Sequence, residues 1–479
     1  MTHTIAIIGA GFSGTIMAAR LLRAQARSAL PSKVAIKIVL INRGAQGATD
    51  NLGRGLAYGT NSDAHLLNVP AGRMSAFPEA ENDFLDFLAQ RGLKVSGGTF
   101  VSRRWYGEYL RHTLDSAVAA CDPQTTLEIM GGEVASLSMP QKPTRGSAHL
   151  KFADGRELTA DRVVLALGNF APTNPALSEA AGFLSPRYIR DPWAPGALDR
   201  IDGTQPIALI GTGLTMFDVA LTLSARWPQA TFNAFSRRGL LPQAHREATS
   251  PPQFDHAPEH ILEGPATARA YLRAVRDAVA RYVRQSNGVG NWRDVIASLR
   301  PITPAMWRRL PPKERARLLR HVLPYWESHR HRAAPAIART IDGLVAQGRL
   351  KIMAARLVDM TADNNAVQLT LRRRHQAHVE LMSAGTVINC TGPTSDFRAA
   401  KEALLLNLHA QGFISPDLNR LGIEVNDQLQ VIDIHGCPMP NLICVGPLLK
   451  ARFWEATAVP ELREHVRNAV HAMLASFEN

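Results

Sequence analysis

The chain has 479 residues, of which 46% are hydrophobic and 20% are charged, a balance typical of a globular protein with two or three domains. Its 54 basic and 41 acidic residues give a net charge of +13, which suits anionic ligands, but no nucleic-acid-binding module accompanies the excess. The first apolar run begins at Ile5 without a basic leader, and the most apolar stretch, 206–225, carries Asp218 and several turn residues. We therefore expect a cytoplasmic protein with no signal peptide, no membrane span and no nucleic-acid partner.

The chain opens with a strand, a glycine-rich turn and a helix, IAIIGAGFSGTIMAARLL, at residues 5–22. In this pattern Gly9 permits a tight turn, Gly11 lets the backbone approach a pyrophosphate, and Gly14 lets the helix pack on the strand. The diphosphate would lie at the helix N-terminus, where N–H groups favour negative charge. The next strand, IKIVLIN, ends at Asn42, where an acid normally holds the ribose, so the chain departs from the usual fingerprint there.

Residues 127–172 carry strand patterns. The segments 127–137 and 148–160 have alternating apolar positions, and Asp154-Gly155 between two of the runs indicates a hairpin. The following run, VVLALG, is continuously apolar and ends at Gly168. It predicts a parallel strand that is covered on both faces.

A second strand–turn–helix pattern, PIALIGTGLTMFD, begins at Pro206. It has Gly211 and Gly213, but Met216 stands at the third glycine position, which predicts a helix packed less closely on its strand. The next strand, TFNAFS, runs into Arg237 and Arg238. Arginine at this place binds the 2′-phosphate of NADP, so the pair favours NADPH; the alternative, a basic turn that only ends a strand, stays open.

The rest of the chain repeats the first half with an insertion. Residues 258–347, approximately, show several short helical patterns with prolines at their starts. Strand patterns follow over 350–382, and the run VINCTG ends at Gly392. The C-terminal section predicts a buried strand, a loop and a final amphipathic helix. The insertion has two open interpretations, a wall or lid of the active site and a dimer surface.

Two phosphate loops predict two nucleotides, one held permanently and one that reduces it, and FAD with NADPH is the usual pairing. The predicted fold class is α/β, with two Rossmann-like dinucleotide-binding domains in three-layer ββα form and a helical insertion in the second. We expect an FAD domain over 1–195, an NADPH domain over 196–385 and a C-terminal part of the FAD domain over 386–479. The four cysteines form no CxxC and no metal-type spacing, which argues against a disulfide oxidoreductase and a metal site.

Five longer motifs carry a family resemblance: GRGLAYGT at 53–60, HLLNVPAGRMSAF at 65–77, FVSRRWYGEYL at 100–110, SRRGLLPQAH at 236–245 and FWEATAVPELR at 453–463. With the two loops, they make the chain resemble two-dinucleotide-binding flavoproteins. Within that group it is most similar to flavin-dependent N-hydroxylating monooxygenases and related FAD/NAD(P)-binding proteins. The Baeyer–Villiger signature FxGxxxHxxxW is absent, so ketone oxygenation is disfavoured.

The resemblance implies a set of cofactor-binding residues. FAD is expected on the first loop, on the stretch from His65 to Met74 and on the segment from Gly446 to Val459, and NADPH on the second loop and the arginine pair. The full set is Gly9, Gly11, Phe12, Ser13, Gly14, Asn42, Arg43, His65, Leu67, Asn68, Met74, Gly168, Gly211, Thr212, Gly213, Arg237, Arg238, Gly392, Gly446, Thr457, Ala458 and Val459.

Three residues are candidates for catalysis: Asn68, Arg73 and Trp454. Asn68 and Arg73 would contact the flavin edge or the nicotinamide, although both residue types also satisfy turns in a loop rich in proline and glycine. Trp454 lies in a loop between a strand and a helix, where functional residues concentrate. His65 is a candidate proton donor or, alternatively, a structural histidine.

The predicted activity is that of an NADPH-dependent flavin monooxygenase. It would use molecular oxygen to hydroxylate a small polar or amino-acid-like substrate on nitrogen, and the arginine excess suits an anionic one. Two alternatives stay open: a dehydrogenase, reductase or oxidase that uses the same cofactors without oxygenating a substrate, and a flavoprotein that senses redox state by binding a partner. Oligomerisation is also open.

Overall fold

The computed structural model of the protein describes residues 2–26, 35–44, 51–60, 62–139, 146–177, 181–247 and 259–477. Its contacts divide the chain into two compact units. Unit 1 comprises Met1–Asp63, Val69–Phe170 and Ser395–Asn479, and unit 2 comprises Ala64–Asn68 and Ala171–Thr394. The domain limits expected at 195 and 385 stay a prediction, and residue 258, where the insertion was expected to begin, lies outside the described residues.

Unit 1 is built around a six-stranded sheet in the order β15-β16-β7-β1-β2-β3. The elements of unit 1 are β1 (Thr2–Ile8), α1 (Phe12–Ala26), β2 (Ala35–Asn42), α2 (Gly55–Tyr58), η1 (Ala71–Arg73), α3 (Asp83–Gln90), α4 (Arg103–Ala119), β3 (Thr125–Gly131), β4 (Val134–Ser138), β5 (Ala148–Phe152), β6 (Glu157–Ala160), β7 (Arg162–Leu165), α12 (Phe397–Ala400), α13 (Ala403–Ala410), β15 (Gln430–Ile432), β16 (Pro438–Cys444), η4 (Pro447–Leu449), α14 (Lys450–Phe453) and α15 (Val459–Ala475).

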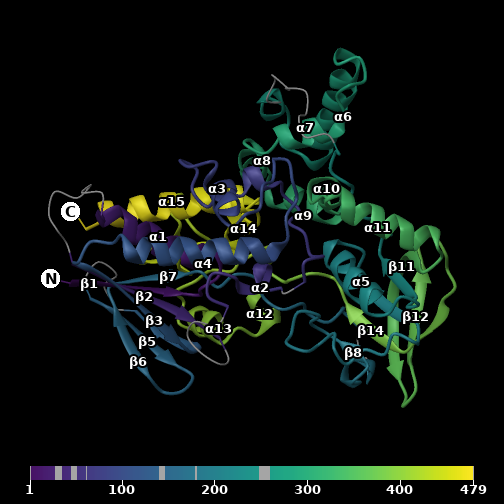
Figure 1. Ribbon diagram of the computed structural model, residues 1–479, viewed down its shortest axis with the longest axis horizontal. Coiled ribbons are helices and arrows are strands. Elements are labelled where there is room, and N and C mark those ends of the chain that lie inside the picture. The colour runs from purple at the N-terminus through teal and green to yellow at the C-terminus, as the bar shows by residue number, and fades with distance from the viewer. Residues whose placement is uncertain are drawn as a thin grey trace. The chain divides into compact units, whose positions relative to one another are not determined.

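The sheet of unit 1 is covered on both faces. Helices α1, α4 and α15 run together along one face, and the antiparallel sheet β4-β5-β6 lies on the other side (Figure 1). Strands β1, β2, β3, β7 and β16 pair in parallel, and β15 pairs with β16 in the antiparallel sense. The apolar run of β7, residues 163–165, is buried because both faces of the sheet are covered, as predicted for this parallel strand.

Unit 2 has a seven-stranded sheet in the order β13-β12-β11-β10-β9-β14-β8. The elements of unit 2 are η2 (Ala181–Leu184), β8 (Tyr188–Ile189), β9 (Ile207–Ile210), α5 (Leu214–Arg226), β10 (Phe232–Ser236), η3 (Glu259–Leu262), α6 (Ala268–Gln285), α7 (Trp292–Ser298), α8 (Thr303–Arg309), α9 (Pro312–His321), α10 (Leu323–Arg330), α11 (Pro335–Ala346), β11 (Leu350–Ala362), β12 (Val367–Arg373), β13 (Glu380–Ala384) and β14 (Thr386–Asn389).

The 13 residues of strand β11 pair with two different strands. Its first part, up to Ala354, pairs in parallel with β10, and from Ala355 onward it pairs with β12 in the antiparallel sense. The β11-β12-β13 meander therefore extends the main sheet of unit 2, whereas β4-β5-β6 of unit 1 forms a sheet of its own. The sequence predicted these meanders but did not distinguish the two arrangements.

The helices of the expected insertion begin at residues that favour helix N-termini. Helices α8, α9, α10 and α11 each carry proline in the first turn, where its missing N–H costs no helical hydrogen bond. Helix α7 begins with a capping box: Asn291 accepts from the Arg293 N–H, and Asp294 accepts from the Asn291 N–H at 2.9 Å. Arg246 Nη2 also donates to Asp294 at 2.5 Å, and the Asp294 side chain is only 5% exposed.

We expect Asp294→Ala to lower the free energy of unfolding by about 3 kcal/mol, because it leaves a partly buried guanidinium without its counter-ion and removes the acceptor of the Asn291 N–H from the capping box. The midpoint of urea denaturation, followed by tryptophan fluorescence, measures this loss. The matched control is Asp277→Ala on the exposed side of α6, which removes the same charge. Equal midpoints for the two variants would contradict a structural role for the Arg246–Asp294 pair.

Candidate functional site

The first glycine loop follows β1, and its three glycines have different geometries. Gly9 has φ +109°, and a Cβ there would lie 2.2 Å from the Ala166 oxygen. A Cβ on Gly14 would lie 1.9 Å from the Gly9 oxygen, so the close contact of α1 with the turn excludes any side chain. At Gly11 the nearest atom to a Cβ would be 3.8 Å away. The loop is thus closed behind Gly9 and Gly14 and open at Gly11, where a pyrophosphate would approach the backbone.

The other FAD candidates of unit 1 lie at the carboxyl ends of the same parallel strands. Phe12 and Ser13 open α1, whose first turn contains no acidic residue and so suits an anion. Gly446 follows β16, and a Cβ on it would lie 3.4 Å from Ser13 Oγ. Gly168 follows β7 with φ +72° and open space around it. The structure therefore brings the first loop and the C-terminal segment together.

Asn42 and Arg43 end β2 at the same edge. Asn42 is buried, with 9% of its surface exposed. Arg43 Nη2 donates to Glu402 at 2.8 Å and lies 3.4 Å from Glu133. Burial acts to lower the pKa of Arg43, but the hydrogen bond and charge of Glu402, with a smaller contribution from Glu133, raise it above its ordinary value. The sequence did not reveal these two carboxylates, which come from distant parts of the chain.

The candidate Trp454 caps α14 in an unusual backbone conformation. Its φ is +56° and ψ −56°, a region that non-glycine residues rarely adopt, and only 5% of the residue is exposed. The Lys450 ammonium lies 5.2 Å from the centre of the indole ring. The next residues, Thr457, Ala458 and Val459, lead into α15. Strain of this kind concentrates at functional sites and is held by the surrounding packing.

The stretch expected to line the flavin is divided between the two units. Arg73 ends η1 and is exposed, and Met74 is buried beside it in unit 1. The loop beyond is anchored by Arg463 of α15, whose Nη1 donates to the Ser75 oxygen at 2.8 Å. The tyrosine hydroxyl of Tyr109 accepts from the Ala76 N–H and donates to Asp83. These contacts connect the end of the stretch to α15, α4 and α3 of unit 1.

The beginning of the stretch belongs to unit 2. His65 is 4% exposed, and its Nε2 lies 2.7 Å from Thr222 Oγ1 on α5. Leu67 is buried, and the main-chain oxygen of Asn68 lies 2.9 Å from His245 Nε2. These contacts give His65 and the Asn68 backbone a structural role in unit 2, and their predicted contact with the flavin stays a prediction.

The second glycine loop repeats the geometry of the first. Gly211 has φ +111°, and a Cβ there would lie 2.5 Å from the Cys390 oxygen. In the first loop a Cβ on Gly9 would lie 2.2 Å from the Ala166 oxygen. Gly213 has no atom within 4 Å of a Cβ, and Gly392 is equally open after β14. Met216 is fully buried, so the second loop accommodates a side chain at the position where Gly14 of the first loop leaves no room for one.

Thr212 fixes the edge of this loop, and the arginine pair follows at the end of β10. Thr212 Oγ1 donates to the Leu240 oxygen at 2.6 Å and lies 2.9 Å from Ser236 Oγ, which ties the loop to the end of β10. Arg238 donates to the Tyr325 hydroxyl at 3.3 Å and lies over its ring at 5.0 Å. Arg237 is exposed and has no ion pair with any residue that the structure describes. The pair therefore keeps its positive charge.

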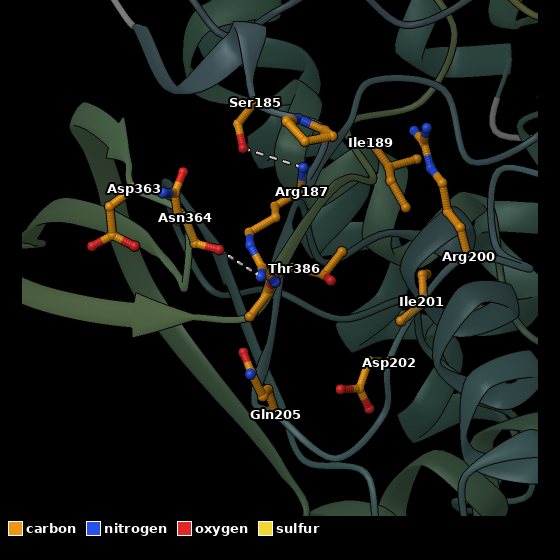
Figure 2. Close-up of a pocket in the computed structure, with 12 residues that line it drawn as sticks. Ser185, Arg187, Ile189, Arg200, Ile201, Asp202, Gln205, Asp363, Asn364 and Thr386 are labelled. Atoms are coloured by element: carbon orange, nitrogen blue, oxygen red, sulfur yellow. Dashed lines mark hydrogen bonds between the residues drawn. The ribbon is translucent and has the colours of Figure 1, made fainter.

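Unit 2 also has a hollow of about 380 Å³ at the opposite ends of its parallel strands (Figure 2). Arg187 before β8, Gln205 before β9 and Thr386 at the start of β14 line it. Arg187 donates to the main-chain oxygens of Gly385 and Asn364 at 3.1 and 2.9 Å. Nucleotides bind at the carboxyl ends of parallel strands, so this hollow is not the coenzyme site. Arg187 instead ties the strand ends to the β11–β12 turn.

Three further findings concern other kinds of site. Cys390 and Cys444 are free and buried, and burial raises the pKa of Cys444 to about 12, which makes its thiol inert. Among the described residues, no group of histidine, cysteine or acidic side chains is placed to hold a metal ion. None of the described helices combines the length and the apolar character that crossing a membrane requires.

Comparisons with known proteins agree with this geometry. Residues 6–170 match a family model described as FAD-NAD(P)-binding. An L-aspartate N-monooxygenase (nitrosuccinate-forming) from Streptomyces davaonensis is 27% identical over 331 residues, and the match covers 57% of this chain and 49% of that protein. The match thus spans about half the length of this curated relative.

Two solved structures share the fold over their whole length. An ornithine N-hydroxylase from Kutzneria sp. 744, in complex with reduced FAD, NADP+ and L-ornithine, covers 100% of both chains with a TM-score of 0.63 and 13% identity. An ornithine hydroxylase from Pseudomonas aeruginosa covers 100% of both chains with a TM-score of 0.64 and 16% identity. At these identities the likeness shows the fold, and it confirms the predicted fold class. Residues 6–170 thus match the FAD-NAD(P)-binding family model, and the whole chain shares the fold of these two ornithine hydroxylases.

Proposed function

We propose that this protein is an NADPH-dependent flavin monooxygenase that hydroxylates the amino nitrogen of a small amino acid. The observation that carries the proposal is the second loop, which is as open as the first and ends in an arginine pair without carboxylate partners among the described residues. A protein that only bound FAD would not need this second site. The curated relative, an L-aspartate N-monooxygenase, supports the reaction class.

The chain's own residues supply binding and positioning. Gly9, Gly11 and Gly14 would hold the FAD pyrophosphate, and Gly211, Gly213 and the arginine pair would hold NADPH. When bound, FAD accepts a hydride and activates oxygen for transfer to the substrate. The N-terminus of α15, with the N–H groups of Ala458 and Val459, would stand against the negative charge of the reduced flavin.

We propose an acidic amino acid as the substrate, with aspartate as the first to test. The net charge of +13 favours anionic ligands, and the relative named above acts on L-aspartate. Arg73 is the candidate partner of a substrate carboxylate because it is exposed beside the buried Met74, at the end of the expected flavin-lining stretch. The four free cysteines of the chain suit a reducing compartment, and we propose a cytoplasmic location.

The test measures oxygen transfer directly. The flavin-loaded protein is supplied with NADPH and oxygen, and NADPH oxidation, hydrogen peroxide and oxidised amino-acid products are quantified with L-aspartate, L-ornithine and no amino acid. We expect L-aspartate to yield an N-oxidised product and to lower the peroxide formed per NADPH. Peroxide alone with every amino acid would make the protein an oxidase. Failure of NADPH to bleach the flavin would overturn the proposal altogether.

A further inference from the structure

Each nucleotide loop has an arginine at the end of the strand that follows it: Arg43 after β2, and Arg237 and Arg238 after β10. Arginine at this place normally accommodates the 2′-phosphate of NADP, so the first loop needs another device to select FAD, whose adenosine ribose carries no such phosphate. Asn42 supplies no negative charge. The surroundings of Arg43 provide the difference.

Glu133 reaches Arg43 because of the register between two strands. Strands β2 and β3 pair in parallel so that Asn42 lies opposite Gly131, and the Gly132 N–H donates to the Asn42 oxygen at 2.9 Å. One residue further, Glu133 Oε1 lies 3.4 Å from Arg43 Nη2. A carboxylate from the β3–β4 connection thus stands where β2 itself lacks one.

Glu402 arrives from the other direction, 359 residues away in the chain. Helix α13 is fastened to β4 by two side chains: Asn407 Oδ1 accepts from the Leu137 N–H, and Gln411 Nε2 donates to the Leu137 oxygen. This contact places Glu402, at the N-terminal end of α13, within 2.8 Å of Arg43 Nη2. The Glu402 side chain is only 15% exposed, and the helix N-terminus favours its negative charge.

We call the charged groups around Arg43 the first rim and those around Arg237 and Arg238 the second rim. The two rims differ in net charge. One guanidinium and two carboxylates leave the first rim with one net negative charge, whereas Arg237 and Arg238 give the second rim two positive charges without a carboxylate among the described residues. Carboxylates accept hydrogen bonds from ribose hydroxyls and repel phosphate. We propose that Glu402, assisted by Glu133, makes the first loop select a dinucleotide without a 2′-phosphate and so keeps NADP out of the FAD site. This inference rests on the proposed assignment of FAD to the first loop and NADPH to the second.

The experiment follows FAD binding rather than turnover. FAD is removed from the full-length protein, and its rebinding is followed by the quenching of flavin fluorescence in the presence of ADP-ribose or 2′-phospho-ADP-ribose. Only binding at the first loop competes with FAD, so the second loop does not disturb the measurement. We expect 2′-phospho-ADP-ribose to compete at least about tenfold more weakly than ADP-ribose in the unaltered protein.

The variants locate the source of this discrimination. Glu402→Gln is expected to reduce the ratio between the two competitors about tenfold, and Glu133→Gln to reduce it less, because its carboxylate is farther from Arg43 and 42% exposed. Glu128→Gln is the matched control: it removes one charge from β3, where Glu128 pairs with Lys37 away from Arg43. If Glu402→Gln fails to rebind FAD, Glu133→Gln gives the same test from the other element.

The outcomes separate this inference from the proposed function. An unaltered protein that does not discriminate, or glutamine variants that rebind FAD with an unchanged ratio, would overturn the role of the carboxylates even if NADPH reduces the flavin normally. Conversely, a ratio that falls in the Glu402 and Glu133 variants alone would support it even if no amino acid is hydroxylated. Failure of the unaltered protein to rebind FAD at a site that ADP-ribose shares would overturn both.

Discussion

Gly14→Ala is expected to yield a protein without flavin and with a free energy of unfolding lower by about 3 kcal/mol or more. A Cβ at this position would lie 1.9 Å from the Gly9 oxygen and 3.2 Å from a side-chain carbon of Ile7, and neither the turn nor the strand behind it can yield. Helix α1 would have to move away from β1. The flavin absorbance per mole of purified protein and the midpoint of thermal unfolding measure the two effects.

Gly11→Ala is the control that separates folding from binding. Gly11 has no positive φ, and the nearest atom to its Cβ would be 3.8 Å away, so the variant is expected to unfold at the midpoint of the unaltered protein. Its methyl group would stand where the pyrophosphate approaches, and we expect FAD affinity to fall about tenfold or more. Full flavin content and unchanged affinity in Gly11→Ala would contradict the assignment of this loop to a dinucleotide. A stable Gly14→Ala would contradict the packing argument.

The two loops were predictable because their chemistry is local. Glycine spacing, an apolar strand before the turn and a helical pattern after it all lie within 20 residues, and the structure gives Gly9 and Gly211 nearly equal φ values of +109° and +111°. The prolines of the helices between α8 and α11 are equally local signals and begin those helices as predicted. Even the missing third glycine was visible in the sequence, and the structure buries Met216, the residue that replaces it.

The contacts that adjust the loops were not predictable, because they join distant segments. Glu402 meets Arg43 only because α13 is fastened to β4, and no periodicity in the sequence encodes that contact. In the same way, the stretch from His65 to Met74 is continuous in sequence but changes units after Asn68. His65 hydrogen-bonds to Thr222, 157 residues away, so its place could not be inferred from the residues beside it. Local patterns therefore predicted the two glycine loops, and we propose that long-range packing decides their specificity.

Arg237→Ala is expected to raise the KM for NADPH about 10- to 100-fold and to leave the KM for NADH nearly unchanged. A charged hydrogen bond to a phosphate contributes about 1.5–3 kcal/mol, and 1.4 kcal/mol corresponds to a factor of ten. Arg237 is exposed and forms no ion pair with the described residues, so its removal costs the folded protein little. Stopped-flow measurement of flavin reduction at varied NADPH and NADH gives both constants. Arg276→Ala, on the exposed side of α6, controls for the loss of one positive charge.

Arg238→Ala tests whether the second arginine is held ready for the phosphate. Its guanidinium lies 5.0 Å over the Tyr325 ring and donates to the tyrosine hydroxyl, so less conformational entropy is lost when it binds an anion. We expect a loss of NADPH affinity similar to that in Arg237→Ala, and a smaller loss in Tyr325→Phe, which keeps the ring but removes the hydroxyl. Both arginine variants should keep their full flavin content, because the first rim is made of other residues. If KM rises equally for NADPH and NADH, the arginines do not bind the 2′-phosphate. That result would contradict the assignment of the second loop to NADPH.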